Sequence, residues 1–169
     1  MPPAAVALAV VDVPLTDPRA LDPALKTGAY LPNLRAVRAA RGRGADEALR
    51  RDRDGWVATG ATSNLVAVVG GRIVTPAIAA GIRPGVTRAR LLALAATAGH
   101  PIDERSLTDA ELVGADALVI TSSIRGVVPV ADLTLGDARR AWSGPDPIAR
   151  SLIGAYDEYV AEVATRGAG

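Results

Sequence analysis

The sequence has no cysteine and no phenylalanine, and only 3% of its 169 residues are aromatic. Without cysteine the chain offers no disulfide, no zinc thiolate site and no iron–sulfur cluster, a composition typical of a reducing compartment. Without phenylalanine, the core must be built from valine, leucine, isoleucine and alanine. We therefore expect a cytoplasmic protein without a metal site.

A large net charge and a long apolar segment are also absent. The formal charge of +1 gives no electrostatic reason to expect nucleic acid or an anionic membrane as a partner. The opening run MPPAAVALAVVDVPL soon reaches Asp12 and Pro14, so it predicts a first strand rather than a membrane span. The length suits one core, and we expect a single domain over residues 1–169.

Lysine is nearly absent as well. Lys26, in LKTGAYLPN, is the one lysine among 19 basic residues, which leaves 18 arginines. A lysine amine can lose its proton and attack a carbonyl, which a guanidinium cannot do. Lys26 is therefore a candidate nucleophile for a Schiff base; the alternative is a surface lysine in a chain with a compositional bias toward arginine.

The period of the apolar residues changes along the chain and predicts both strands and helices. Strands are expected over 4–13, 47–59 with a turn at DRDG, 63–76 with a turn at Gly70–Gly71, 101–107 and 117–123. Helices are expected over 32–41, 86–98, 108–115 and 146–166. Strands that occur both in hairpins and between helices favour a mixed sheet of α/β or α+β type.

Two of these helices carry further signals. Thr108 and Glu111 have the spacing of a capping box. The last helix should end before Gly167. Its apolar residues recur at helical spacing on one face: Ile148, Leu152, Tyr156, Tyr159 and Val163.

Two polar segments favour an anion. In GIRPGVTRAR (81–90), Gly85 and Thr87 lie at the start of a helix, where unpaired N–H groups and a hydroxyl suit a phosphate; an ordinary N-cap at Thr87 is the alternative. TSS (121–123) ends the strongest strand, where ligands often bind in α/β sheets, although it could equally be a polar strand terminus.

The order of the motifs LKTGAYLPN, ADEAL, DGWV, TSNLVAV, GIRPGVTR and SSIRGVVPV resembles the class IV aminotransferases, the fold type IV pyridoxal-phosphate enzymes, over about residues 5–135. The lysine segment is most similar to that of the aminodeoxychorismate lyases. The resemblance implies the C-terminal domain of that fold, a pseudo-barrel with flanking helices, and pyridoxal 5'-phosphate as the cofactor.

The resemblance also implies site residues. Lys26 would form the Schiff base with the cofactor and move the α-proton. The cofactor-binding residues would be Lys26, Thr59, Asn64, Gly85, Val86, Thr87, Ser122 and Ser123. Tyr30 and Arg125 would face the substrate, and a solvent-facing Arg125 is an equal alternative.

Three features depart from the family pattern. Thr59 stands where the family has a glutamate that keeps the pyridine nitrogen protonated, and a hydroxyl carries no charge for that purpose. Ala29 replaces a common asparagine. We also expect the chain to lack the family's N-terminal domain, which in the family supplies a phosphate-binding arginine and part of the substrate pocket.

These features lead to two hypotheses. In the first, the chain is a lyase or aminotransferase acting on an amino acid or an aminodeoxychorismate-like substrate, with lyase or proton-transfer chemistry favoured because of Thr59. In the second, it is a non-catalytic or partner-dependent half-enzyme, a subunit or scaffold. Both predict a homodimer, or a complex with a chain that supplies the N-terminal domain.

Overall fold

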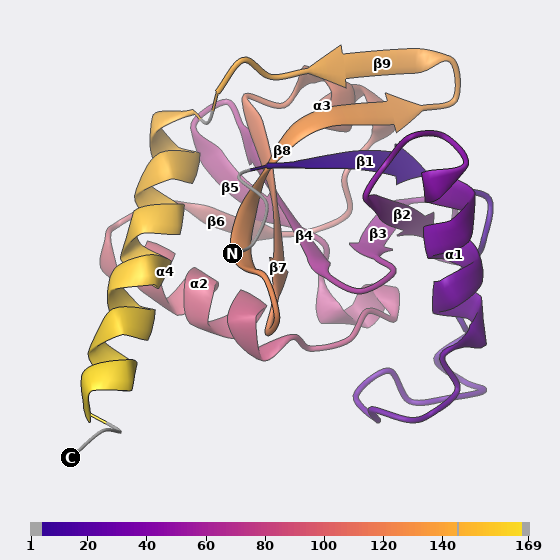
Figure 1. Cartoon of the computed structure of the whole chain (residues 1–169), viewed down its shortest axis with the longest axis horizontal. Coiled ribbons are helices and arrows are strands. Elements are labelled where there is room, and N and C mark those ends of the chain that lie inside the picture. Colours follow the sequence, from indigo (N-terminus) through magenta and orange to yellow (C-terminus); the bar gives the residue numbers. More distant parts are fainter. Residues whose placement is uncertain (1–4, 145, 167–169) are drawn as a thin grey trace.

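The computed structural model describes residues 5–144 and 146–166, and Figure 1 shows their arrangement. Its helices and strands, in chain order, are β1 (Val6–Val10), α1 (Leu31–Arg41), β2 (Glu47–Arg51), β3 (Val57–Gly60), β4 (Asn64–Val69), β5 (Arg72–Thr75), the 3₁₀ helix η1 (Ile78–Ala80), α2 (Val86–Thr97), β6 (Ile102–Glu104), α3 (Asp109–Gly114), β7 (Ala117–Ser122), β8 (Gly126–Leu135), β9 (Ala138–Ala141) and α4 (Pro147–Arg166).

The strands form one mixed sheet in the order β3-β2-β1-β8-β7-β4-β5-β6, with β9 paired to β8. Strand β1 runs parallel to both β2 and β8, whereas β4 pairs antiparallel with β5 and β7. An isolated antiparallel bridge joins Val57 on β3 to Leu107, just beyond β6, so the two ends of the sheet approach each other. The predicted mixed sheet is confirmed, and it curls into a half-barrel.

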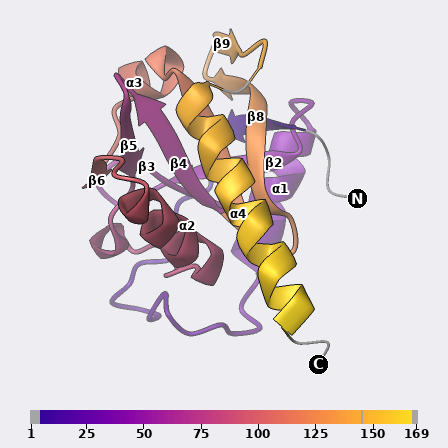
Figure 2. The same cartoon turned by 90° about the vertical axis from the view of Figure 1, so that its left-hand side faces the viewer.

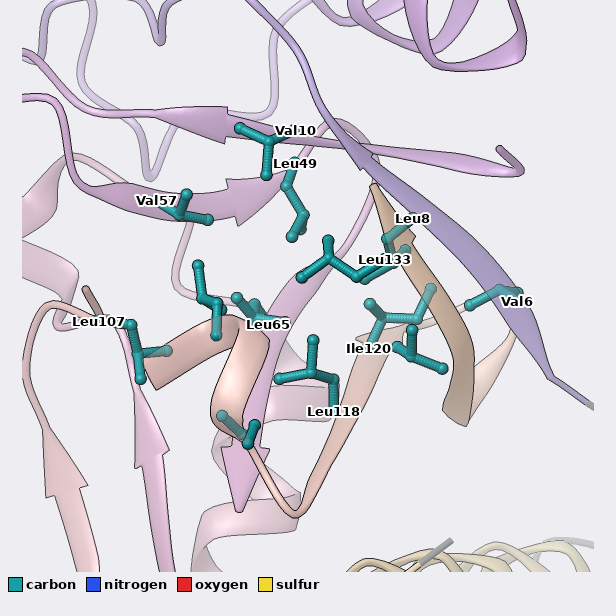
Figure 3. Packing of buried hydrophobic residues seen from close by; sticks show 14 of the residues in the cluster. Val6, Leu8, Val10, Leu49, Val57, Leu65, Leu107, Leu118, Ile120 and Leu133 are labelled. Carbon is teal, nitrogen blue, oxygen red and sulfur yellow. The ribbon is translucent and has the colours of Figure 1, made fainter. Parts of the chain in front are cut away.

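The central strands β4 and β7 are apolar along most of their length because both of their faces are buried. Along β4, Leu65 belongs to the cluster inside the curl, which Figure 3 shows from close by, whereas Val66 belongs to the cluster beneath the helices. Along β7, Leu118 and Val119 divide in the same way. This alternation explains why these strands read as continuous hydrophobic runs rather than as alternating ones.

Helices cover the outer surface of the curl. Helix α1 lies against β1 and β2, where Ala36 and Ala40 pack against Ala9 and Ala48. Helices α2 and α4 lie side by side on another part of the sheet, and Leu91 of α2 and Leu152 of α4 share one buried cluster (Figure 2). The alanines of α1 allow a close approach between helix and strands, because their methyl groups take up little space between the backbones.

Both predicted hairpins are confirmed. Gly70 and Gly71, which turn the second hairpin, have φ angles of 56° and 76°, in the left-handed region that glycine enters without strain. The predicted helices are also present. The first strand is shorter than expected, because chain pairing with β2 and β8 ends near Val10 and the segment from Val11 onward becomes a loop.

Strand β8 was not among the expected strands, and two further details also differ from the sequence expectations. Strand β9, which was not predicted, is a four-residue strand whose residues are all exposed, so its sequence carries no apolar pattern. Val163 was placed on the apolar face of α4, but it is 49% exposed because the last turns of α4 extend beyond the sheet. Gly167 lies outside the described residues. In the described part of the chain, no helix combines the length and apolarity needed for a transmembrane segment.

The capping box at the start of α3 is confirmed. The Thr108 hydroxyl accepts from the Glu111 N–H at 3.1 Å, and the Glu111 carboxylate accepts from the Thr108 N–H at 2.9 Å. Arg105 also donates to this carboxylate, and together these bonds lower the pKa of Glu111 to about 2. Helix α3 spans six residues, so its stability depends on this cap.

Replacing Thr108 with alanine should therefore lower the free energy of unfolding by about 1 kcal/mol, because one N–H at the helix start loses its acceptor. Urea denaturation followed by circular dichroism measures the change. Thr97→Ala is the matched control, since the Thr97 hydroxyl is exposed and bonds only to the Ala93 carbonyl one turn earlier. Equal losses of unfolding free energy in the two variants would show that the Thr108 cap contributes no more than the Thr97 hydroxyl.

Candidate functional site

A cavity of about 560 Å³ lies at one end of the sheet. Its walls come from the Lys26 loop (residues 11–30), the segment from β3 to β4, the segment that leads into α2, and the turn between β7 and β8, which gather at the same end of the molecule (Figure 1). All ten residues proposed from the sequence line it: Lys26, Tyr30, Thr59, Asn64, Gly85, Val86, Thr87, Ser122, Ser123 and Arg125. Segments far apart in sequence therefore meet around one space.

The Lys26 loop forms one side of this cavity. Lys26 is exposed there, and its neighbour Leu25 is 56% exposed despite its apolar side chain. The loop has little regular structure, but Arg83 Nη1 donates to the Ala24 carbonyl at 3.2 Å and links it to the opposite wall. Lys26 is thus delivered to the cavity by a loop that other segments hold in place.

Arg50, on β2, makes the principal side-chain connection to the base of this loop. Its side chain is buried, and its Nε donates to the Val13 carbonyl at 3.0 Å while Nη2 donates to the Pro14 carbonyl. Its Nη1 donates to Asn33 Oδ1 at 3.2 Å, in the first turn of α1. The two ends of the Lys26 loop are therefore tied to one guanidinium. Burial lowers the pKa of Arg50, yet a guanidinium stays charged inside proteins.

Asn64 and two glycines shape the floor of the cavity. Asn64 Nδ2 donates to the Arg83 carbonyl at 3.0 Å, which fixes the segment before α2. A Cβ on Gly85 would lie 2.0 Å from Asn64 Oδ1, and a Cβ on Gly60 would lie 2.1 Å from Ser63 Oγ. Only glycine fits at these two positions, because any side chain would displace the polar groups that face the cavity.

The start of α2 gives the cavity an anion-binding wall. The N-cap is Gly85, in an extended conformation, so the alternative of an N-cap at Thr87 is wrong. Thr87 lies in the first turn and is buried, whereas Val86 is 73% exposed. The first turn of α2 has no acidic residue. Its free N–H groups and the positive end of the helix dipole therefore remain available to a phosphate or carboxylate.

Three buried side-chain polar atoms of the described residues lack a hydrogen-bond partner: Ser63 Oγ, Thr121 Oγ1 and Arg125 Nη1. All three residues line this cavity. Buried polar groups without partners are costly in a folded protein. Their concentration around one space indicates that a polar ligand completes their hydrogen bonding.

Other hydroxyls of the cavity already have partners. Thr59 Oγ1 donates to the Ser63 carbonyl at 2.7 Å, and Ser122 Oγ accepts from the Arg125 N–H at 3.1 Å. Sequence reasoning missed Ser63 and Arg50, and it named Thr121 only as part of TSS (121–123), without a role of its own. Ser63, between β3 and β4, and Thr121, near the end of β7, stand inside motifs already singled out, and their hydroxyl groups beside apolar strands were the signal available.

A protein-family model described as amino-transferase class IV matches residues 1–133. A branched-chain-amino-acid aminotransferase of Pseudomonas aeruginosa is 33% identical over 138 residues, which cover 81% of this chain and 44% of that protein. A branched-chain-amino-acid aminotransferase of Arabidopsis thaliana, mitochondrial, is 31% identical over 121 residues, covering 70% of this chain and 32% of that protein.

Solved structures of similar proteins also match this chain. A branched-chain amino acid aminotransferase of Thermobaculum terrenum, in its pyridoxal phosphate form, matches with a TM-score of 0.85 and 28% identity, covering 92% of this chain and 51% of its own. A Legionella pneumophila protein provisionally assigned as a 4-amino-4-deoxychorismate lyase matches with a TM-score of 0.81 and 30% identity, covering 91% of this chain and 56% of its own. The chain thus spans between about a third and just over half of the length of these relatives.

The geometry predicts a specific role for Arg50. Arg50→Gln should lower the free energy of unfolding by about 2 kcal/mol, because the Val13 and Pro14 carbonyls lose charged donors. Amide hydrogen exchange should accelerate through the Lys26 loop more than in the sheet. Urea denaturation and exchange mass spectrometry measure both effects.

Arg51→Gln is the matched control for this prediction. Arg51 is the next residue of β2 and pairs at 2.9 Å with Asp109 at the surface, where an ion pair contributes at most about 1 kcal/mol. If Arg51→Gln loosened the Lys26 loop as much as Arg50→Gln, the guanidinium of Arg50 would not be what holds it.

Proposed function

This chain belongs to the class IV aminotransferase family, and from that premise we propose that it binds pyridoxal 5'-phosphate through Lys26 and takes part in amino transfer on an amino acid. Pyridoxal 5'-phosphate is the cofactor of this family. The observation that carries the proposal is the cavity that unites Lys26, the start of α2 and the unpartnered hydroxyls. When bound, the cofactor supplies a ring that withdraws electrons from the substrate's α-carbon.

The residues present fit this cofactor. The free N–H groups at Gly85, Val86 and Thr87 suit its phosphate, and the hydroxyls of Ser122 and Ser123 lie on the same cavity wall. Asn64 acts indirectly, since its bond to the Arg83 carbonyl holds the segment that presents those N–H groups. The Ser63 and Thr121 hydroxyls would gain partners when the cavity is filled.

The remaining site residues would act on the substrate. Lys26 would hold the cofactor through its carbonyl carbon, with loss of water; once the substrate's amino group has taken its place there, the freed Lys26 amine would take and return the proton of the substrate's α-carbon. Tyr30 lies on the cavity wall near Lys26, on the same loop, and would help to orient the substrate. Arg125 would donate to the substrate carboxylate. Amino transfer is the preferred reaction because branched-chain aminotransferases recur among the relatives.

A lyase or proton-transfer reaction is the second candidate, and Thr59 is the observation that favours it. The comparisons give no support to our sequence-based preference for this chemistry over amino transfer. Thr59 nevertheless offers no negative charge, and its hydroxyl proton is directed to the Ser63 carbonyl at 2.7 Å. A ring nitrogen beside Thr59 would therefore have no anionic partner there to keep it protonated.

The open side of the cavity bears on how the chain would work. Apolar side chains at its rim are exposed, among them Leu25, Val86 and Ile124, the last at 95%. Exposed apolar groups around a binding site favour a covering partner. We infer that a second copy, or a segment corresponding to the other half of the relatives, covers this rim. A partner-dependent subunit that binds the cofactor without turnover is the alternative form of this proposal.

The role of Lys26 can be tested directly. The purified chain mixed with pyridoxal 5'-phosphate should gain a visible absorbance band, and borohydride should fix the cofactor's mass to the peptide that contains Lys26. Lys26→Arg is the matched variant, because it keeps the charge but cannot bond to the carbonyl. It should lose both signals. A band that survives in Lys26→Arg, or none in the natural chain, would contradict the proposal.

Thr59→Glu tests the choice between the two reactions. A carboxylate at this position should raise amino transfer by about tenfold relative to proton exchange, since an ionic partner for the ring nitrogen contributes roughly 1.4 kcal/mol. Oxo-acid formation from L-leucine and deuterium uptake at its α-carbon measure the two reactions. Thr59→Ser keeps the hydroxyl and should leave the ratio of amino transfer to proton exchange unchanged. The same ratio in Thr59→Glu would show that residue 59 does not determine the reaction.

A further inference from the structure

Glu47 is a buried carboxylate immediately behind the cavity. It lies on β2, and its side chain is 1% exposed. Its Oε1 accepts from the Ala48 N–H at 3.0 Å, and its Oε2 accepts from the hydroxyl of Thr62, a residue of the cavity wall. A buried charge of this kind is costly unless it is paired, so the position of its nearest cation is informative.

That cation is Arg125, which comes from the other side of the cavity in the turn between β7 and β8. Its Nη1 lies 4.0 Å from Glu47 Oε2, too far for a hydrogen bond but close enough for strong attraction. The same Nη1 is buried and has no hydrogen-bond partner. The Ser122 hydroxyl fixes the backbone of this turn through the Arg125 N–H. Arg125 is therefore oriented by charge while its donors remain free.

We propose that Glu47 is a positioning residue that directs Arg125 into the cavity, and that the two create a subsite for the carboxylate of the substrate. This inference rests on the proposed function, since it names the group that would recognise the substrate's acid end. Arg125 supplies the hydrogen bonds, which a planar guanidinium makes to both carboxylate oxygens. The negative charge of Glu47 orients the Arg125 guanidinium.

The distances explain why Glu47 does not simply neutralise Arg125. The Glu47 oxygens accept from Thr62 and Ala48, and neither accepts from Arg125. A ligand carboxylate would bind to the accessible part of the guanidinium, where a charge-assisted hydrogen bond is stronger than the attraction across 4.0 Å. Without the charge of Glu47, the Arg125 side chain, which is 32% exposed, would turn toward water.

The test compares two probes that differ in charge. Isobutyrate and isobutyramide are titrated, by nuclear magnetic resonance, into the chain loaded with pyridoxal 5'-phosphate. The natural chain should bind isobutyrate about tenfold more tightly than isobutyramide. Glu47→Gln and Arg125→Gln should each bring this ratio close to one, and the double variant should be no worse than Arg125→Gln alone.

The double variant separates positioning from general structural support. If Glu47 had only a structural role, Glu47→Gln would weaken the binding of both probes equally. It would also weaken binding further when added to Arg125→Gln. Either result overturns the proposal. Glu162→Gln, which removes the carboxylate of an exposed pair with Arg166 on α4, is the matched control and should leave the ratio unchanged. An unchanged ratio in Glu47→Gln would likewise overturn the subsite.

A further variant guards against misfolding of Glu47→Gln. Thr62→Val keeps the charge of Glu47 but frees Oε2, which should then accept from Arg125 directly and reduce the ratio; a ratio equal to that of the natural chain overturns the proposal. If no absorbance band forms with pyridoxal 5'-phosphate, the proposed function fails. The same titrations on the unloaded chain then test the subsite separately. A preference for isobutyrate that is lost in Glu47→Gln and in Arg125→Gln supports the subsite, and a preference that does not depend on these residues overturns it.

Discussion

A charged guanidinium buried between β2 and the Lys26 loop is the constraint on which the candidate site depends. Arg50 bonds to backbone carbonyls at one end of the loop and to Asn33 just beyond the other. Asn33 in turn donates to the Ala61 carbonyl at 2.5 Å, in the segment between β3 and β4. A loop without regular structure is thereby held against two walls of the cavity, and the lone lysine reaches the site because polar contacts substitute for a packed element.

Most of the fold follows from local signals in the sequence. Turn glycines, the capping box at Thr108 and the apolar periods each act within a few residues, so the hairpins and helices could be predicted from short segments. Strand β9 was not predicted because a short exposed strand has no apolar period. Val163 was misplaced for a related reason: periodicity defines a face of α4, but not how far the sheet extends beneath it.

The candidate site was predictable only where a motif carried it. The order of the motifs made it possible to name ten residues that line one cavity, and their individual roles remain proposals. Glu47 and Arg50 were read as ordinary residues of a strand, since nothing near them in the sequence indicates that Arg125 or Pro14 lies beside them. Buried polar contacts of this kind join residues from distant elements, and local composition does not encode such pairs.

The parallel pairing of β1 has a consequence for how the chain acquires its structure. Val6 lies beside Val130, so β1 leaves the ribosome long before one of its two partner strands is made. Until β8 emerges, that edge of β1 exposes unpaired backbone groups that another chain could engage. Contacts so distant along the chain also slow folding, because a long loop must close before they form. Protection of β1 by a chaperone during synthesis would thus matter more for this topology than for a sheet built from consecutive hairpins.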